Sequence, residues 1–306
     1  MSRKVIVVLG PTACGKTAFA VALARRLGGA VVSADSRQVY RGLDIGSGKD
    51  LMEYTAGGEP VMTRLLDIMD PAEAEPYTLA DFMRDAKAAI LELGTLGKVP
   101  ILCGGTGLYI HALIKGYELP GGPADRVFRR SVKDADTEAL AAHLSESRPL
   151  ENGEAENPYR LSRRIEIERA ADVRSVHGGP LPDTDYLVLG ALRPRPEIHR
   201  RIEKRLDERL RNGMIEEVKR LHGQGVAWEK LESFGLEYRE VSRFLQGENG
   251  FQEMRDHLLV KIRQFAKRQD TWFRKMEREG VAIRWIPPEN LDEAEFLCRG
   301  FLKREC

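Results

Sequence analysis

The sequence predicts an α/β fold, with a P-loop-containing parallel sheet flanked by helices, an inserted small helical subdomain and a helical C-terminal region. Three observations lead to this prediction. Short apolar runs alternate with amphipathic stretches early in the chain, which is typical of a parallel sheet. A glycine-rich segment follows the first apolar run. The last third of the chain shows long helical patterns with few strands.

The predicted elements follow from local patterns. Residues 4–9 (KVIVVL) form a β-branched apolar run, which predicts a buried first strand. Residues 17–27 predict a helix, because Phe19, Leu23 and Leu27 recur every four positions and two glycines follow. The remaining predictions are strands at 30–33, 99–103, 186–192 and 281–286 and an amphipathic helix at 78–93.

Changes in composition predict three segments. The stretch ELPGG at 118–122 indicates a hinge, and the residues after it are helical, charged and poor in strands until the Gly-Gly-Pro at 178–180. We therefore expect a P-loop catalytic core at 1–120, an inserted helical subdomain at 121–180, and at 181–306 a return to the core followed by a helical C-terminal region.

Composition excludes several classes of protein. A net charge of +1 gives no bulk attraction for nucleic acid, and the small basic excess is C-terminal. No apolar run approaches the ~18 residues of a membrane span, and the N-terminal run is too short for a signal peptide. We therefore expect a cytoplasmic protein without a membrane partner. The four cysteines are scattered, so neither disulfides nor a zinc site are expected.

Residues 10–17 (GPTACGKT) match the phosphate-binding P-loop pattern in full. The glycines let backbone N–H groups face an anion, and the start of the following helix adds positive charge. Lys16 supplies a charge for a phosphate oxygen, and Thr17 offers its hydroxyl to Mg²⁺. The motif predicts a diphosphate-bearing ligand without naming the reaction. The predicted diphosphate-binding residues are Gly10, Thr12, Ala13, Cys14, Gly15, Lys16 and Thr17.

Two further candidates follow predicted strands. Asp35 comes after the second strand, where it can hold Mg²⁺ or act as a general base, and a helix cap or turn is the alternative. Thr106, in the segment GGTGLY, offers a hydroxyl beside backbone that can approach a ligand closely, and a tight turn is the alternative. Because ligands bind beyond the C-terminal ends of parallel strands, we expect both residues to share a crevice with the P-loop.

Two basic segments allow two interpretations each. Arg160, Arg163 and Arg164 have helical spacing and can grip phosphates together, although a solvated face is the commoner reason for such a run. Residues 261–274 interleave basic and aromatic side chains, which suits contacts with RNA phosphates and stacking on unpaired bases. The same stretch also contains a plausible core stripe at Ile262, Phe265, Ala266, Gln269 and Phe273.

These segments together resemble the tRNA dimethylallyltransferase family, whose members prenylate an adenosine beside the anticodon. The order of the motifs is that of the family, and they cover most of the chain. SADSRQVY after a P-loop, followed by GGT and AKRQ-x-TWF, is far more specific than a P-loop alone. The matching pieces are GPTACGKT (10–17), SADSRQVYRGLDIG (33–46), RLLDIMDP (64–71), YTLADFMRDA (77–86), GGTGLY (104–109), RLSR (160–163) and AKRQDTWFR (266–274).

The resemblance implies a reaction. Dimethylallyl diphosphate is expected on the P-loop with Mg²⁺, and N6 of adenosine 37 of a tRNA attacks C1 of its allyl group. By resemblance, Asp35 accepts the N6 proton and Thr106 contacts the adenosine region or the diphosphate. The inserted subdomain and the C-terminal helices are expected to clamp the anticodon stem-loop of the tRNA, and a monomer is expected. The implied tRNA-binding residues are Asp35, Ser36, Arg37, Gln38, Tyr159, Arg160, Arg163, Arg239, Lys267 and Arg268.

The chain departs from the family pattern at several positions, which bear on tRNA specificity more than on the chemistry. Thr63 stands where the family commonly has His, Asn157 lies in an altered segment before Arg160, and the usual Gly-Tyr segment is Gly235 to Tyr238. Three alternatives remain open at this point: a P-loop kinase of a small molecule, an adenylate isopentenyltransferase, and a nucleotide-dependent RNA-binding module without chemistry.

Overall fold

The computed structural model describes residues 2–72, 76–119, 158–169 and 177–303, together with residues 128, 129, 138, 140, 141 and 144. The chain divides into two compact units. One unit contains Met1–Lys115 and Leu181–Cys306, and the other contains Gly116–Pro180. The elements of each unit are given separately below.

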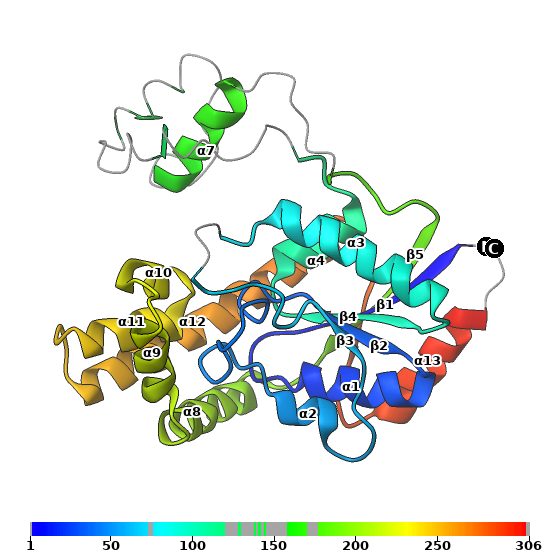
Figure 1. The fold of residues 1–306 in the computed structure, drawn as a ribbon. Helices are drawn as coiled ribbons and strands as arrows, with labels where there is room; N and C mark the ends of the chain where they lie inside the picture. Colours follow the sequence, from blue (N-terminus) through cyan, green and yellow to red (C-terminus); the bar gives the residue numbers. More distant parts are fainter. Residues whose placement is uncertain are drawn as a thin grey trace. The chain divides into compact units, whose positions relative to one another are not determined.

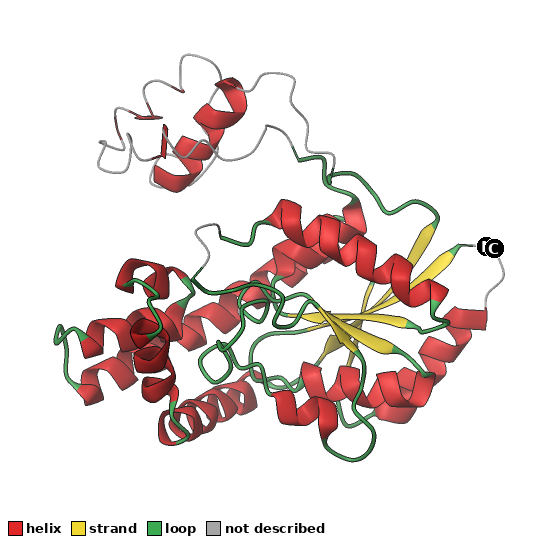
Figure 2. Ribbon diagram, in the orientation of Figure 1, coloured by secondary structure: helices red, strands yellow, loops and turns green. Residues whose placement is uncertain are grey.

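The larger unit is built on a parallel sheet flanked by helices, so the predicted fold class is confirmed (Figures 1 and 2). Its described part has six strands in the order β3-β2-β4-β1-β5-β6, and neighbouring strands are parallel. The strands are β1 (Arg3–Leu9), β2 (Ala30–Ser33), β3 (Thr63–Arg64), β4 (Pro100–Gly104), β5 (Thr184–Ala191) and β6 (Ile283–Ile286).

The register of the central strands brings their C-terminal ends to one edge of the sheet. Leu9 pairs with Gly104 on one side and with Gly190 on the other. Ser33 pairs with Cys103 in the same layer of the sheet. The loops that follow β1, β2, β4 and β5 therefore meet at this edge, as the fold predicts for a ligand site.

Four helices belong to the N-terminal half of this unit: α1 (Lys16–Leu27), α2 (Leu51–Thr55), α3 (Leu79–Thr95) and α4 (Gly107–Lys115). The helix α1 starts from the P-loop and ends at Gly28, whose left-handed backbone satisfies the last turn. The helix α3 begins with a capping box between Thr78 and Asp81. Periodicity predicted α1 and α3, whereas β3, α2 and α4 were not predicted.

The C-terminal half of the larger unit supplies α8 (Arg195–Arg211), α9 (Met214–Gly223), α10 (Trp228–Ser233), α11 (Leu236–Leu245), α12 (Phe251–Arg278) and α13 (Leu291–Lys303). The helices α8 to α11 gather at one end of the sheet, and α13 packs on α1 (Figure 1). The helix α12 has 28 residues and therefore runs for about 42 Å. It packs against α11 and α4, so its side chains can reach the edge of the sheet.

The described part of the smaller unit contains α7 (Pro158–Arg169). Leu161 and Ile165 of this helix pack with Phe128, Leu140 and Leu144 in a small core. Asn157 and the side chain of Tyr159 lie outside the described residues. No helix in the described part of the whole chain is both long and apolar enough to cross a bilayer.

Candidate active site

A pocket lies at the C-terminal edge of the sheet, between the P-loop and α12. Lys16 and Thr17 line it from the P-loop, and Asp35 and Gln38 line it from the turn after β2. Gln269 closes it from α12. The structure thus brings together the phosphate-binding and acidic candidates that the sequence predicted to share one crevice.

The backbone of the P-loop is held in an unusual conformation. Ala13 and Gly15 both have left-handed backbone, with φ of 63° and 92°. This conformation is uncommon for a residue other than glycine, and such local strain concentrates at ligand sites. Cys14 is fully buried against Gly10, where a Cβ on the glycine would lie 2.7 Å from the sulfur. Burial raises the pKa of the Cys14 thiol, which indicates a space-filling role.

Two arginines bind the backbone of the P-loop, one just before α8 and one in the second turn of that helix. The Nε of Arg193 donates to the carbonyl of Cys14, and the Nε of Arg201 donates to the carbonyl of Ala13, both at 2.8 Å. Arg205, one turn after Arg201, lines the pocket itself. Arg193 and Arg201 thus restrain the loop through its carbonyls, while Arg205 is paired with Asp50 and Arg193 with Glu197.

A second, larger groove runs along the other side of the P-loop. Lys16, Thr17 and Arg205 line both hollows, so the predicted phosphate-binding residues are reachable from two sides. Glu53 of α2 also lines the groove. Burial, and then Asp50, raise the pKa of the Glu53 carboxyl.

Asp35 is anchored by its own turn. Its Oδ1 accepts the backbone N–H of Arg37 at 2.9 Å and that of Gln38 at 3.4 Å, as in an Asx-turn. The Nε of Arg37 lies 3.8 Å from the same oxygen. The turn interpretation from the sequence is thus correct, and it fixes the carboxylate in the wall of the pocket.

Gln269 connects the two glycine-rich loops. Its Oε1 accepts the backbone N–H of Thr12 in the P-loop, and its Nε2 donates to the carbonyl of Gly105, both at 2.8 Å. A Cβ on Gly105 would lie 2.4 Å from that Nε2. The sequence placed Gln269 in a core stripe and missed this role, although it belongs to the AKRQ motif.

Thr106 lies in the turn between β4 and α4. Its backbone N–H donates to the carbonyl of Ala34, and its carbonyl accepts the N–H of Tyr109. The residues that line the pocket in the described structure include Gly104 but not Thr106. A direct contact between Thr106 and substrate therefore stays a prediction.

The residues predicted to bind tRNA differ in their surroundings. Arg37 is mostly buried, forms an ion pair with Glu237 at 3.0 Å and lies over the ring of Phe265. Lys267 and Arg268 of α12 are exposed, whereas Ser36 and Arg239 are half-buried. In the smaller unit, Arg160 is exposed and Arg163 pairs with Glu166 at 3.0 Å.

The core-stripe interpretation of residues 261–274 holds in part, and the interpretation as an RNA-binding segment stays a prediction. Ile262, Ala266 and Phe273 are buried, as the core stripe requires. Phe265 is half-buried and lines the pocket. One face of α12 therefore supports the core and the pocket, while Lys267 and Arg268 lie on the exposed side.

Comparison with known proteins identifies the family of the chain. A model of the IPP transferase family matches residues 38–276, and a model of isopentenyl transferases matches residues 3–62. The chain is 45% identical over 283 residues to tRNA dimethylallyltransferase 2 of Pelobacter propionicus, covering 92% of this chain and 88% of the relative. It is 42% identical over 306 residues to tRNA dimethylallyltransferase 1 of Syntrophus aciditrophicus, covering 99% of this chain and all of the relative.

Among solved structures, the full-length tRNA isopentenylpyrophosphate transferase of Bacillus halodurans is similar to this chain, with a TM-score of 0.71 and 32% identity. The similarity covers 98% of this chain and 97% of that one. A family model that spans most of the chain and relatives above 40% identity show the family, and the similar solved structure has the same fold. The protein is therefore a member of the IPP transferase family.

Proposed function

We propose that the protein transfers a dimethylallyl group from dimethylallyl diphosphate to N6 of adenosine 37 in the anticodon loop of tRNAs, with release of diphosphate. The observation that carries this proposal is the pocket in which Lys16 and Arg205 face the same space as Asp35. Such a site combines cations for a leaving diphosphate with a carboxylate that can accept a proton. The names of the relatives support the same chemistry.

The proposed transfer is a single displacement. The N6 lone pair forms a bond to C1 of the allyl group, the bond between C1 and the diphosphate oxygen breaks, and the N6 proton passes to Asp35. Lys16 and Arg205 stabilise the negative charge that grows on the leaving diphosphate. Each well-placed donor of this kind contributes on the order of 3 kcal/mol to a transition state.

The residues around Thr17 fit a magnesium ion. The Thr17 hydroxyl and the Asp35 carboxylate line the same pocket, and Mg²⁺ prefers such oxygen ligands together with phosphate oxygens. When bound, Mg²⁺ would neutralise part of the diphosphate charge. Thr17 is our candidate for the protein ligand of the ion, and Lys16 holds the remaining phosphate oxygens.

The acceptor base is proposed to leave the anticodon stack before it reaches the pocket, as base-modifying enzymes require. Phe265 offers an aromatic surface in the pocket wall, and the exposed Lys267 and Arg268 on the same helix suit contacts with RNA phosphates. Tyr159, Arg160 and Arg163 remain candidates for tRNA contacts from the smaller unit. A monomeric state and a cytoplasmic location stay predictions.

Two of the alternatives from the sequence are less well supported. A small-molecule kinase has no use for a long helix with exposed basic groups, and the matching relatives are named as transferases of prenyl groups to tRNA. An adenylate isopentenyltransferase shares the P-loop, but the family model that covers most of this chain extends through α12.

The direct test is mass spectrometry of anticodon-loop adenosine after incubation of purified protein with tRNA and isotope-labelled dimethylallyl diphosphate. We expect the adenosine to gain one dimethylallyl group, and free AMP to remain unmodified. A parallel incubation with ATP in place of the prenyl donor should give no phosphorylated product. Modification of AMP alone would favour the adenylate enzyme, and transfer of phosphate would favour the kinase.

A further inference from the structure

The loop at residues 43–49, called here the partition loop, has one side toward each of the two hollows beside the P-loop. Ser47 and Gly48 line the pocket that contains Asp35. Ile45 and Lys49 line the groove on the other side of the P-loop. The position of this loop therefore affects both hollows at once.

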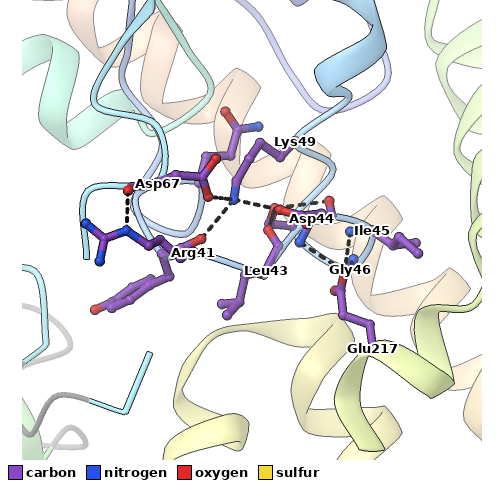
Figure 3. A network of polar contacts seen from close by, with 12 residues as sticks. Arg41, Leu43, Asp44, Ile45, Gly46, Lys49, Asp67 and Glu217 are labelled. Atoms are coloured by element: carbon purple, nitrogen blue, oxygen red, sulfur yellow. Dashed lines mark hydrogen bonds and ion pairs between the residues drawn. The ribbon is translucent and has the colours of Figure 1, made fainter. Parts of the chain in front are cut away.

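A buried carboxylate holds the middle of the partition loop. Glu217 of α9 accepts the N–H groups of three consecutive residues: Asp44 at 3.0 Å, Ile45 at 2.7 Å and Gly46 at 3.0 Å (Figure 3). The hydroxyl of Tyr238 also donates to Glu217, at 2.7 Å. Glu217 is only 5% exposed, so these four donors replace the water that the carboxylate has lost.

A buried cation holds the C-terminal end of the same loop. The Nζ of Lys49 donates to the carbonyl of Tyr40 and to Asp44, both at 2.8 Å, and it also binds Asp67 (Figure 3). Its side chain is fully buried. Two buried charges of opposite sign thus hold the partition loop: Lys49, which belongs to the loop itself, and Glu217, which belongs to α9.

The carbonyl of Gly48 transmits this restraint to the site. It accepts hydrogen bonds from Nε2 of Gln38 and from Nη2 of Arg205, both at 3.2 Å. Gln38 in turn donates its backbone N–H to Asp35. A Cβ on Gly48 would lie 1.7 Å from a guanidinium nitrogen of Arg209, so the backbone here packs directly against the arginines of α8.

We propose that Glu217 is a positioning residue for prenyl transfer. Its carboxylate fixes the partition loop so that the Gly48 carbonyl holds Arg205 on the diphosphate side and Gln38 on the Asp35 side. This inference rests on the proposed function, and it adds that the donor and acceptor sides of the site are coupled through one backbone carbonyl. A purely structural Glu217 would stabilise the fold without changing the affinity for diphosphate.

The test compares Glu217→Gln with two controls. The glutamine keeps the size of the side chain, but one carboxylate oxygen is replaced by an NH₂ group. That group cannot accept the hydrogen bonds that the carboxylate oxygen accepts now. Glu216→Gln changes the exposed neighbour on the same helix. Glu240→Gln changes a buried glutamate of α11 that binds Lys261 and His257 instead of the partition loop, so it reports a general loss of stability.

Thermal midpoints, the Kd of inorganic diphosphate with Mg²⁺ by calorimetry, and kcat and KM for both substrates are measured for each variant. For Glu217→Gln we expect diphosphate affinity to fall at least about fivefold and kcat to fall about tenfold, as for loss of a charged hydrogen-bond partner. Glu240→Gln should change the affinity for diphosphate less than about twofold, even if its thermal midpoint falls as far as that of Glu217→Gln. Unchanged diphosphate affinity in Glu217→Gln, or an equal loss in Glu240→Gln, overturns the proposal.

A milder variant covers the case in which Glu217→Gln does not fold. Tyr238→Phe removes one hydrogen bond to the carboxylate and keeps the ring, and we expect about a threefold loss in the same two quantities. A fully active Tyr238→Phe with unchanged diphosphate affinity counts against the proposal. Wild-type protein that binds diphosphate but transfers no dimethylallyl group would refute the proposed function, while the affinity comparison would still decide the role of Glu217.

Discussion

The two walls of the pocket are built in different ways. The donor wall consists of the P-loop, residues 10–17, with Arg205 beside it, and the side chains that line the pocket there include two cations, Lys16 and Arg205. The acceptor wall consists of the turn at residues 35–38 and Gln269, and it carries the carboxylate of Asp35, two amide side chains and the guanidinium of Arg37, which is paired with Glu237. In the proposed reaction this difference would separate two tasks, because one wall would offset charge on the leaving group and the other would receive a proton.

The largest expected effect comes from the acceptor wall. In Asp35→Asn the amide oxygen can still accept the N–H groups of Arg37 and Gln38, so the turn is kept while the base is lost. We expect kcat to fall by about 10³, the usual range for a general base, with tRNA affinity largely unchanged. Single-turnover transfer and a filter-binding assay with tRNA measure the two quantities, and turnover like that of the wild type would remove Asp35 from the role of base.

The next effect tests the donor wall. Lys16→Ala removes a charge from both hollows, and we expect kcat/KM for dimethylallyl diphosphate to fall by about 10². Lys204→Ala is a matched control, because Lys204 lines the larger groove on the other side of the P-loop and not the pocket, and its side chain is 78% exposed. Steady-state kinetics on both variants checks the prediction. Equal losses in the two variants would mean that the total positive charge near the site, and not a lysine at the P-loop position, assists the reaction of dimethylallyl diphosphate.

A smaller effect is expected where the two walls are joined. Gln269→Ala removes hydrogen bonds to the N–H of Thr12 and to the carbonyl of Gly105. The loss of two neutral bonds at about 1 kcal/mol each predicts a decrease in kcat/KM of about thirtyfold. The exposed Gln264 on the same helix provides the control Gln264→Ala. Full activity in Gln269→Ala would show that the two glycine-rich loops hold their positions without it.

The two walls also differ in how much of them the sequence predicts. The P-loop is contiguous, so its pattern names Lys16 and Thr17 directly, and Asp35 follows from its place after a strand. Arg205 and Gln269 come from helices far along the chain. On a helix, an arginine has the pattern of a solvated face and a glutamine among apolar residues that of a core stripe. Only the packing of α8 and α12 against the P-loop shows which of them reach the site.

The same limit applies to the fold and to the tRNA contacts. Periodicity finds α1 and α3, but α2 has five residues and β3 has two, which is too short for a period to emerge. Arg37 was placed among the tRNA-binding residues because of its motif. Its ion pair with buried Glu237 is a contact that no local pattern indicates, and contact of Arg37 with tRNA stays a prediction.

The smallest expected effect concerns the helix pair that supports the acceptor wall. His111 of α4 is fully buried, lies edge-on to Trp272 of α12 and has its Nε2 3.2 Å from Glu279. Burial lowers the pKa of its imidazole, and Glu279 offsets this only in part. Below a pH of about 6.5, the unfolded chain binds a proton at this histidine that the folded chain takes up only at lower pH. Stability at this position is therefore present above about pH 6.5 and is lost as the pH falls through the lowered value.

Thermal midpoints at pH 7.5 and pH 5.5 test this for wild type and His111→Phe, which keeps an aromatic ring and cannot titrate. We expect the thermal midpoint of the wild type to fall by about 2 °C more than that of the variant between pH 7.5 and pH 5.5. Diphosphate affinity should change with pH to the same extent in both proteins, because His111 supports α12 and not the donor wall. An equal loss of thermal midpoint in both proteins would place the pH sensitivity elsewhere in the fold. A selective loss of diphosphate affinity in the wild type would show that protonation of His111 also affects the donor wall.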